Sequence, residues 1–283
     1  MNVRNRACRA ALAAALALLV ATGLLGLPAP AQAAGAPQLV TTTVLSGANP
    51  WVVATAQCPI GKQLHGGGAA ILNGGGNVTI TELVPSLTTN SLTAVGYEND
   101  PPGGVWAVEA HAVCADPTPN LTVVTNDSPF NQDPTKSATA VCPPGQKTYG
   151  LGWEQTGDLG NVLLEQAEPA AGLNSVTVTA SANGGWAGWW ELRAYAICGD
   201  DAGGMSRIEL QTVTNSSTSK WAQMSCPGAA QVYGVGGEHT AGGDVVLHRL
   251  APAGAALGAA RTAAHENGAF AGTWSVTMYA ICA

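Results

Sequence analysis

The chain contains few charged residues. Only 10% of its 283 residues are Asp, Glu, Lys or Arg, against roughly 25% in an average soluble protein. The 11 basic residues are outnumbered by 18 acidic ones and form no basic run or patch in the sequence. Since nucleic acids and anionic membrane surfaces bind clustered Lys and Arg, the sequence disfavours both partners. The surface must therefore consist largely of Thr, Ser, Asn, Gln and Gly, which suits an extracellular protein or one that contacts polar polymers.

The usual sequence signatures of catalysis and metal binding are also missing. No Gly-x-Ser-x-Gly nucleophile elbow occurs. The five histidines form no pair with the spacing of metal ligands, and Cys58 has no second Cys or His within the two to four residues typical of zinc sites. We therefore expect no metal, no cofactor and no catalytic residues, and we interpret the chain as a protein other than an enzyme.

Only one long apolar run is present, and it lies at the start of the chain. Three arginines precede it within the first nine residues, and it extends from Ala10 to about Leu27. The small-residue triplet 31–33 follows, so residues 1–33 read as a secretory signal peptide. An uncleaved membrane anchor is the alternative, but Pro28 and the cleavage triplet favour removal. We therefore expect a secreted, extracellular protein with no membrane span after cleavage.

Six of the seven cysteines lie on a regular grid. The two members of each pair are 56 residues apart, and each pair recurs after 84 residues. Such internal repetition decides the architecture before any local signal does. It predicts three tandem units at residues 37–116, 120–201 and 206–283. The cysteines are Cys58, Cys114, Cys142, Cys198, Cys226 and Cys282.

An even number of cysteines in an oxidising compartment favours three disulfides. Threefold repetition leaves three symmetric pairings: closure within each unit, or exchange with a neighbouring unit in either direction. We favour closure within each unit, because a unit of about 84 residues has a thin core that gains from a covalent link.

The repeated positions predict an all-β fold of three antiparallel, sandwich-like units. In the last strand of each unit, a Trp and a Cys share one apolar face of a period-two pattern. The repeated Trp106, Trp190 and Trp274 are therefore predicted to be core residues. The Gly-x-Gly that follows each Cys-Pro turn indicates a bulge or a close backbone approach. Beads on a string and packing about a pseudo-threefold axis both remain open.

The repeated pattern resembles a module of secreted proteins from GC-rich, Gram-positive actinobacteria. It consists of Cys-Pro-x-Gly, a Gly-x-Gly, a late Trp and a final Tyr/His-Ala-Val/Ile-Cys. In the second unit the matching residues are Cys142-Pro143-Pro144-Gly145, Gly150, Gly152, Trp190 and Tyr195-Ala196-Ile197-Cys198. The resemblance implies a secreted, disulfide-linked β module without an assigned activity, so it supplies no functional residues. The Cys-Pro-x-Gly and Gly-x-Trp segments are also similar to the threefold β-prism of vitelline outer-layer proteins.

Function is sought where the units differ, because a single site breaks the repeat. Only the second unit has Trp153, Trp186 and Trp189, and exposed Trp near Gly-rich turns can stack on sugar rings. These three residues are the predicted ligand-binding residues. Trp51 and Trp221 are expected at contacts between units, whereas His65 and His111 replace a Tyr of other units and are expected on the surface.

Three classes of function follow from these patterns. The first is a non-catalytic extracellular module that binds a polysaccharide, a cell-wall polymer or a protein. The second is a purely structural cell-surface protein. The third is a secreted hydrolase or an enzyme inhibitor, which would be indicated by a pocket with paired acids whose pKa values are perturbed. The sequence leaves the ligand and the oligomeric state open.

Overall fold

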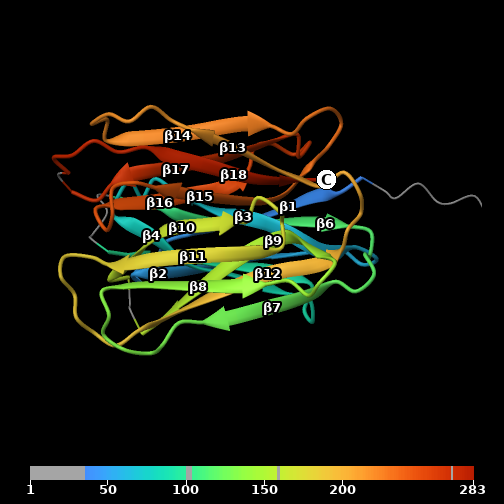
Figure 1. Ribbon diagram of the computed structural model, residues 1–283. Coiled ribbons are helices and arrows are strands. Elements are labelled where there is room, and N and C mark those ends of the chain that lie inside the picture. Colours follow the sequence, from blue (N-terminus) through green and yellow to red (C-terminus); the bar gives the residue numbers. More distant parts are fainter. Residues whose placement is uncertain (1–35, 100–103, 158–159, 269) are drawn as a thin grey trace, which may run out of the picture. The chain divides into compact units, whose positions relative to one another are not determined.

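The structure is a computed structural model that describes residues 36–99, 104–157, 160–268 and 270–283 (Figure 1). The expected signal peptide, residues 1–33, lies outside the described residues. Within them the chain forms 18 β-strands and no helix, which confirms the all-β prediction. The strands are β1 Gln38–Leu45, β2 Trp51–Gln57, β3 Gln63–Leu72, β4 Val78–Ser86, β5 Ser91–Glu98, β6 Ala107–Ala115, β7 Thr122–Asp127, β8 Thr135–Val141, β9 Gln146–Thr156, β10 Val162–Pro169, β11 Ser175–Ala182, β12 Glu191–Asp200, β13 Ser206–Gln211, β14 Ser219–Ser225, β15 Val232–His239, β16 Val245–Pro252, β17 Ala259–Glu266 and β18 Val276–Cys282.

Strand pairing follows one pattern in each third of the chain. The first six strands form the antiparallel sets β1–β6–β3 and β2–β5–β4. The next six form β7–β12–β9 and β8–β11–β10. The last six form β13–β18–β15 and β14–β17–β16. The strands thus group by sixes within the three predicted ranges, whose exact boundaries stay a prediction.

Further pairing joins the thirds of the chain to one another in cyclic order. Antiparallel bridges link β4 to β9, β10 to β15 and β16 to β3. The set β2–β5–β4 therefore continues into β9–β12–β7 as one six-stranded sheet, and the other sets join correspondingly. A parallel bridge between β15 and β3 merges the remaining strands into a sheet of twelve. The thirds are consequently not beads on a string. A pseudo-threefold axis stays a prediction, which the cyclic pairing supports.

The repeated glycines lie where strands β3, β9 and β15 approach one another. A Cβ atom on Gly150 would lie 2.5 Å from the Cα atom of Gly66 and 2.6 Å from the carbonyl oxygen of His65. A Cβ atom on Gly152 would lie 2.1 Å from the carbonyl oxygen of Leu83 on β4. Both neighbours are backbone, so only glycine fits there. This confirms the expectation of close backbone approach at the Gly-x-Gly pairs.

Three aromatic side chains meet beside these glycines. The ring of His65 lies 5.4 Å from that of Tyr149 and 5.7 Å from that of Tyr233, and the two tyrosine rings are 5.8 Å apart. The expectation that His65 and His111 are surface residues was wrong, because they are only 1% and 6% exposed. The period-two pattern was taken to place both side chains on a solvent-exposed face, but neighbouring strands cover that face.

The core of each sandwich is built as expected around one tryptophan. Trp106, Trp190 and Trp274 are all exposed by 1% or less. Each buried indole N–H donates a hydrogen bond: to Glu98 at 2.7 Å, to the Asp133 carbonyl at 2.9 Å and to Glu266 at 3.0 Å, respectively. The tryptophans are therefore satisfied core residues, as buried indoles should be.

The disulfides confirm closure within each unit. Cys58 bonds to Cys114, Cys142 to Cys198 and Cys226 to Cys282. In the first third the bond joins the end of β2 to β6, and thus links the two sheets of the sandwich. Disulfides of this kind form and persist in oxidising or extracellular compartments.

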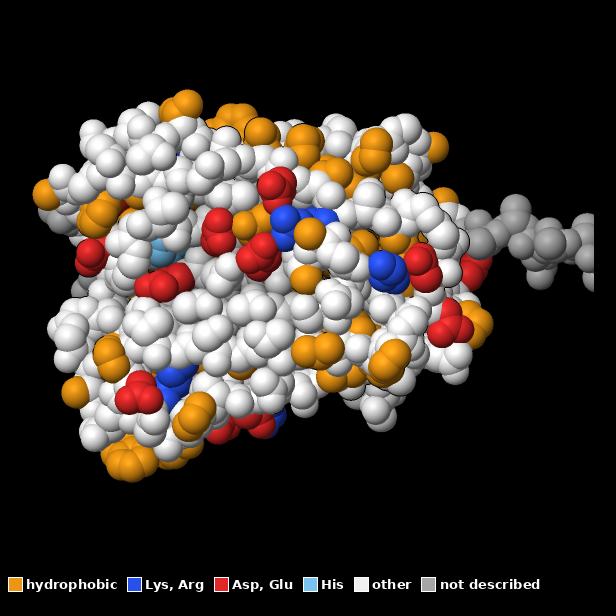
Figure 2. Space-filling model, in the orientation of Figure 1, with side chains coloured by type: hydrophobic (Ala, Val, Ile, Leu, Met, Phe, Trp, Pro, Cys, Tyr) orange, Lys and Arg blue, Asp and Glu red, His pale blue; other side chains and the backbone are white. Residues whose placement is uncertain are grey.

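The surface agrees with the composition. In the space-filling view most of the visible face is neither charged nor hydrophobic, and charged side chains occur in small groups (Figure 2). No described segment forms a helix long and apolar enough to cross a membrane.

Candidate ligand-binding groove

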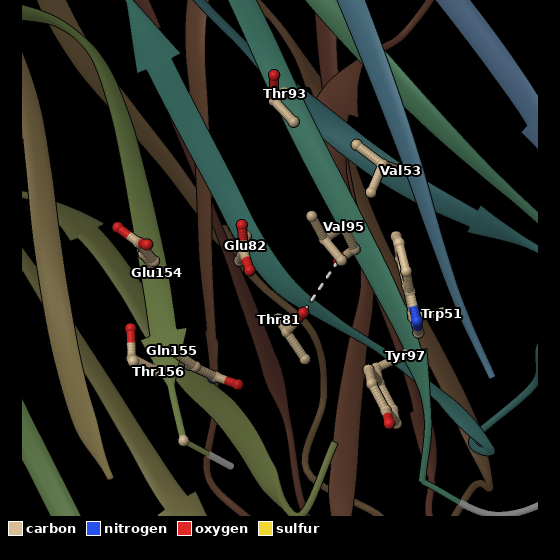
Figure 3. Close-up of a pocket in the computed structure, with 11 residues that line it drawn as sticks. Trp51, Val53, Thr81, Glu82, Thr93, Val95, Tyr97, Glu154, Gln155 and Thr156 are labelled. Carbon is tan, nitrogen blue, oxygen red and sulfur yellow. Dashed lines mark hydrogen bonds between the residues drawn. The ribbon is translucent and has the colours of Figure 1, made fainter. Parts of the chain in front are cut away.

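A groove of about 560 Å³ lies on the sheet β2–β5–β4–β9–β12–β7 (Figure 3). It covers the junction at which β4 of the first third pairs with β9 of the second. Residues from both thirds therefore line it. They are Trp51, Val53, Thr81, Glu82, Thr93, Val95, Tyr97, Glu154, Gln155, Thr156 and Gly157.

One side of the groove is aromatic and aliphatic. On β2 and β5, the pairs Trp51–Tyr97 and Val53–Val95 are opposite one another in the ladder. Alternation places all four side chains on the same face of the sheet. Trp51 is 47% exposed, and Figure 3 shows it beside Tyr97. Trp51 was expected at a contact between units, and it lines a groove that residues of the first two thirds share, with its indole partly exposed.

The other side of the groove carries two carboxylates. Glu82 on β4 is opposite Glu154 on β9 in the ladder, and Figure 3 shows both side chains projecting from the sheet toward the same side. Burial, followed by repulsion from Glu154, raises the pKa of Glu82. Among the described residues Glu82 has neither a hydrogen-bond partner nor a cation within salt-bridge distance.

Glu154, by contrast, is held by polar partners. The hydroxyl of Tyr195 donates a short hydrogen bond to its carboxylate, and Nη1 of Arg193 lies 3.4 Å from Oε2 of the same group. Burial and this hydrogen bond raise the pKa of Tyr195 to about 12, so the phenol stays a donor at neutral pH. The two carboxylates thus differ: Glu82 is half-buried and prone to protonation, while Glu154 is fixed as an acceptor of hydrogen bonds.

The acid pair occurs at one of the three junctions that join the thirds. At the junction of β10 and β15 the corresponding residues are Gln166 and Glu238. At the junction of β16 and β3 they are Arg249 and Ala70. The strand pairing therefore repeats at all three junctions, whereas the paired side chains differ. Such a difference is expected where one junction carries a functional site.

An exposed aromatic pair lies at the Gly157 end of the groove. Phe130 and Trp189 are 52% and 56% exposed, and their ring centroids are 5.9 Å apart. A Cβ atom on Gly157 would lie 2.6 Å from the carbonyl oxygen of Trp189 and 3.5 Å from Cε2 of Phe130. The aromatic surface therefore continues past the end of the groove.

The three predicted ligand-binding tryptophans do not form one site. Trp153 was wrongly assigned, because it is fully buried and its indole N–H donates to the Ile80 carbonyl at 3.1 Å. Trp186 is half-buried and packs against the core, so its ring has limited access to a ligand. Trp189 is exposed as expected, and it lies beside the groove rather than beside Trp153.

Sequence reasoning missed the aromatic side of the groove. Trp51, Val53 and Tyr97 belong to the first third, whereas the search for a site was confined to the second. The available signal was the alternation of β2, which places Trp51 opposite the buried Val52 and Ala54. It could not show that β9 would supply the second side.

Metal binding has no support in the described part of the chain, where no three His, Cys, Asp or Glu residues group closely enough to hold an ion. No protein-family model matches the chain, and a search of curated proteins finds no significant match.

Proposed function

We propose that this protein is secreted and binds a glycan of the extracellular space or cell wall through the groove. The observation that carries the proposal is the combination of Trp51 and Tyr97 on one side with Glu82, Glu154 and neighbouring hydroxyl groups on the other. Sugar rings have an apolar face that stacks on aromatic side chains and hydroxyl groups that need polar partners. The groove offers both kinds of contact.

Secretion is supported by two independent features. The basic, apolar and small-residue order of residues 1–33 is that of a signal peptide. The three disulfides belong in an oxidising compartment. The polar, sparsely charged surface is suited to contact with polysaccharides. The resemblance to secreted actinobacterial modules also implies secretion.

The proposal is tested by retention of the mature protein on insoluble neutral glycans and on cell-wall preparations. Trp51→Ala should abolish retention, and Tyr97→Ala should weaken it. The matched control is Trp221→Ala on another sheet, where the indole is 57% exposed and should make no contact with a neutral glycan. Retention that Trp51→Ala leaves unchanged would refute the groove as the site. No retention of the unmutated protein on any glycan would refute glycan binding.

The acid pair favours a second candidate function, hydrolysis of a glycosidic bond. Cross-strand neighbours have Cβ atoms about 4.5–5.5 Å apart, and retaining glycosidases hold their two carboxyl groups about 5–5.5 Å apart. In this reading protonated Glu82 donates its proton to the leaving glycosidic oxygen as the bond to C1 breaks. The Glu154 carboxylate attacks C1 as that bond breaks and forms a glycosyl ester. Glu82 then takes a proton from the water that attacks C1, and the bond between C1 and Glu154 breaks, which restores both carboxyl groups.

Hydrolysis and binding are separable by experiment. Release of reducing ends from a retained glycan should be lost in Glu82→Gln and in Glu154→Gln, while retention persists. If the unmutated protein is retained but releases no reducing ends at any pH, the hydrolase candidate is refuted and the binding proposal stands.

A further inference from the structure

A second polar site lies on the sheet strands β14, β17, β16, β3, β6 and β1, away from the groove. Arg261 and His265 on β17 approach His248 and Arg249 on β16; these four residues are called the basic cluster. Strand pairing brings them together, because Arg249 is opposite Ala263, which lies between Arg261 and His265 on β17, and His248 directly precedes Arg249. The sequence showed no basic patch, since these residues meet only through strand pairing.

The centre of the basic cluster is a small residue. Ala263 is opposite Arg249 on one side of β17 and opposite Trp221 on the other. Arg261 and His265 are two positions away on β17, and therefore on the same face. Ala263 is thus surrounded by two guanidinium groups, an imidazole and an indole.

The same place on the first sheet is the groove. At a spacing of 168 residues Val95 replaces Ala263, while Val53, Thr93 and Tyr97 replace Trp221, Arg261 and His265. Glu82 is opposite Val95 as Arg249 is opposite Ala263. All five of these residues line the groove: Val53, Glu82, Thr93, Val95 and Tyr97. One scaffold position therefore carries an acidic group in one sheet and basic groups in another.

The corresponding position of the middle third, on β11 of the twelve-stranded sheet, has side chains that bond only to one another. Its centre is Thr179, opposite Ser137 and Gln166. The hydroxyl of Thr179 donates to Ser137 at 3.2 Å and to Gln166 at 3.1 Å. These side chains satisfy one another, so no polar group there awaits a partner.

The charges of the basic cluster are poorly balanced. The other two described arginines, Arg193 and Arg207, each contact two carboxylates. Arg249 contacts only Glu109, at 3.5 Å. In the described part of the chain Arg261 has no carboxylate within 4.0 Å, and its guanidinium lies 4.7 Å from the ring centroid of Trp221. The cluster therefore has positive charge that no protein group neutralises.

Two polar atoms of the basic cluster are buried without a hydrogen-bond partner. They are Nε of Arg261 and Nδ1 of His248. Buried polar groups in native proteins nearly always have a partner, so these two atoms need one from outside the chain, such as a water molecule or an anion. Burial, with repulsion from His265, Arg249 and Arg261, lowers the pKa of His248 to about 4. An anion among these groups would remove that repulsion.

We propose that the basic cluster binds an oxyanion, namely a phosphate, sulfate or carboxylate group of an extracellular ligand. The guanidinium groups of Arg249 and Arg261 have the forked geometry that matches such oxygens. Trp221, 57% exposed, supplies an apolar face beside the charge, as an acidic sugar would need. The proposal is independent of the groove, which is formed by other strands.

Glu109 and His111 on β6 limit the site on one side. Oε2 of Glu109 lies 3.5 Å from Nη2 of Arg249 and 3.4 Å from Nε2 of His111, whose Nδ1 is 3.0 Å from the Thr41 hydroxyl. An incoming oxyanion is repelled by Glu109 and attracted by Arg261 and Arg249. Burial lowers the pKa values of His248 and His111, and their protonation adds positive charge, so binding should tighten as the pH falls.

The test titrates the mature protein with sulfate, inorganic phosphate and acetate at constant ionic strength, following the histidine ring signals by NMR. Saturation should raise the pKa of His248 above its value of about 4. Arg261→Gln should weaken binding by about tenfold, the worth of one charge-assisted hydrogen bond. The matched control is Arg207→Gln, which removes the same charge from β13, outside the basic cluster. An unchanged His248 pKa, or equal losses in both variants, would overturn the proposal.

Retention on charged polymers then identifies which oxyanion the protein prefers. Sulfated, phosphorylated and uronate-containing polysaccharides are compared with a neutral one of similar size. Arg261→Gln should lose retention on the preferred anionic polymer, whereas Trp51→Ala should keep it. Loss of sulfate binding in Trp51→Ala would overturn the separate site, while loss of neutral-glycan retention alone bears only on the groove.

Discussion

Replacement of Trp153 by alanine gives the sharpest test of how the thirds are held together. Its indole is fully buried, and its N–H donates across the β4–β9 junction to the Ile80 carbonyl at 3.1 Å. Truncation of a buried Trp costs about 3–5 kcal/mol, and an unsatisfied carbonyl adds about 1 kcal/mol. We therefore expect Trp153→Ala to destabilise the fold by about 4–6 kcal/mol.

The assay is thermal unfolding of the oxidised mature protein followed by near-ultraviolet circular dichroism. A loss of 1 kcal/mol lowers the melting temperature by about 2–4 °C in a protein of this size, so Trp153→Ala should lower it by about 8–24 °C. Trp189→Ala is the control, since its side chain is 56% exposed and should change stability by less than about 0.5 kcal/mol. Equal shifts in the two variants, or none in Trp153→Ala, would refute the reasoning.

Three further outcomes are expected from thermal unfolding. The raised pKa of Glu82 means that its ionised form opposes folding, and the associated stability is present at acid pH and lost as the pH rises through the folded pKa. Glu82→Gln should therefore raise the melting temperature above neutral pH but not near pH 3; a stabilisation confined to acid pH contradicts this. Gly150→Ala places a Cβ 2.5 Å from backbone and should cost about 1–3 kcal/mol, whereas Gly258→Ala, with nothing within 4 Å, should cost nothing. Removal of the Cys142–Cys198 bond by double alanine substitution should cost about 4 kcal/mol in the chain-entropy model for its separation of 56 residues, and an unchanged melting temperature would contradict that loss.

The all-β class, the tryptophan core and the disulfide pairing could be predicted from the sequence because each depends on short-range patterns. Alternation along the last strand places Trp190 and Cys198 on one face, and the 84-residue spacing repeats that arrangement. The structure finds Trp190 buried and Cys198 bonded within its own unit. Burial and closure of a small sandwich are local consequences of the period-two pattern.

Trp153 was misassigned because its difference from the other units received more weight than its place in the strand. It is two residues from Leu151 on β9, and both are buried, whereas Glu154 between Trp153 and Gln155 faces the groove. Alternation alone would have placed Trp153 in the core. A residue that breaks a repeat can therefore fill a gap between units as readily as it can bind a ligand.

The groove and the basic cluster could not be predicted, since both form where a strand of one third pairs with a strand of another. Glu82 and Glu154 are 72 positions apart, and no sequence pattern around either residue indicates that the two lie opposite one another. The junctions share one backbone arrangement but carry Glu82, Gln166 and Arg249 at corresponding places. If only stability were needed, mutually hydrogen-bonded hydroxyl and amide groups like those around Thr179 would suffice at all three junctions. The basic replacements instead leave Nε of Arg261 and Nδ1 of His248 without a hydrogen-bond partner among the described residues, and the acidic replacement places Glu82 opposite Glu154. The two proposed binding sites rest on these differences.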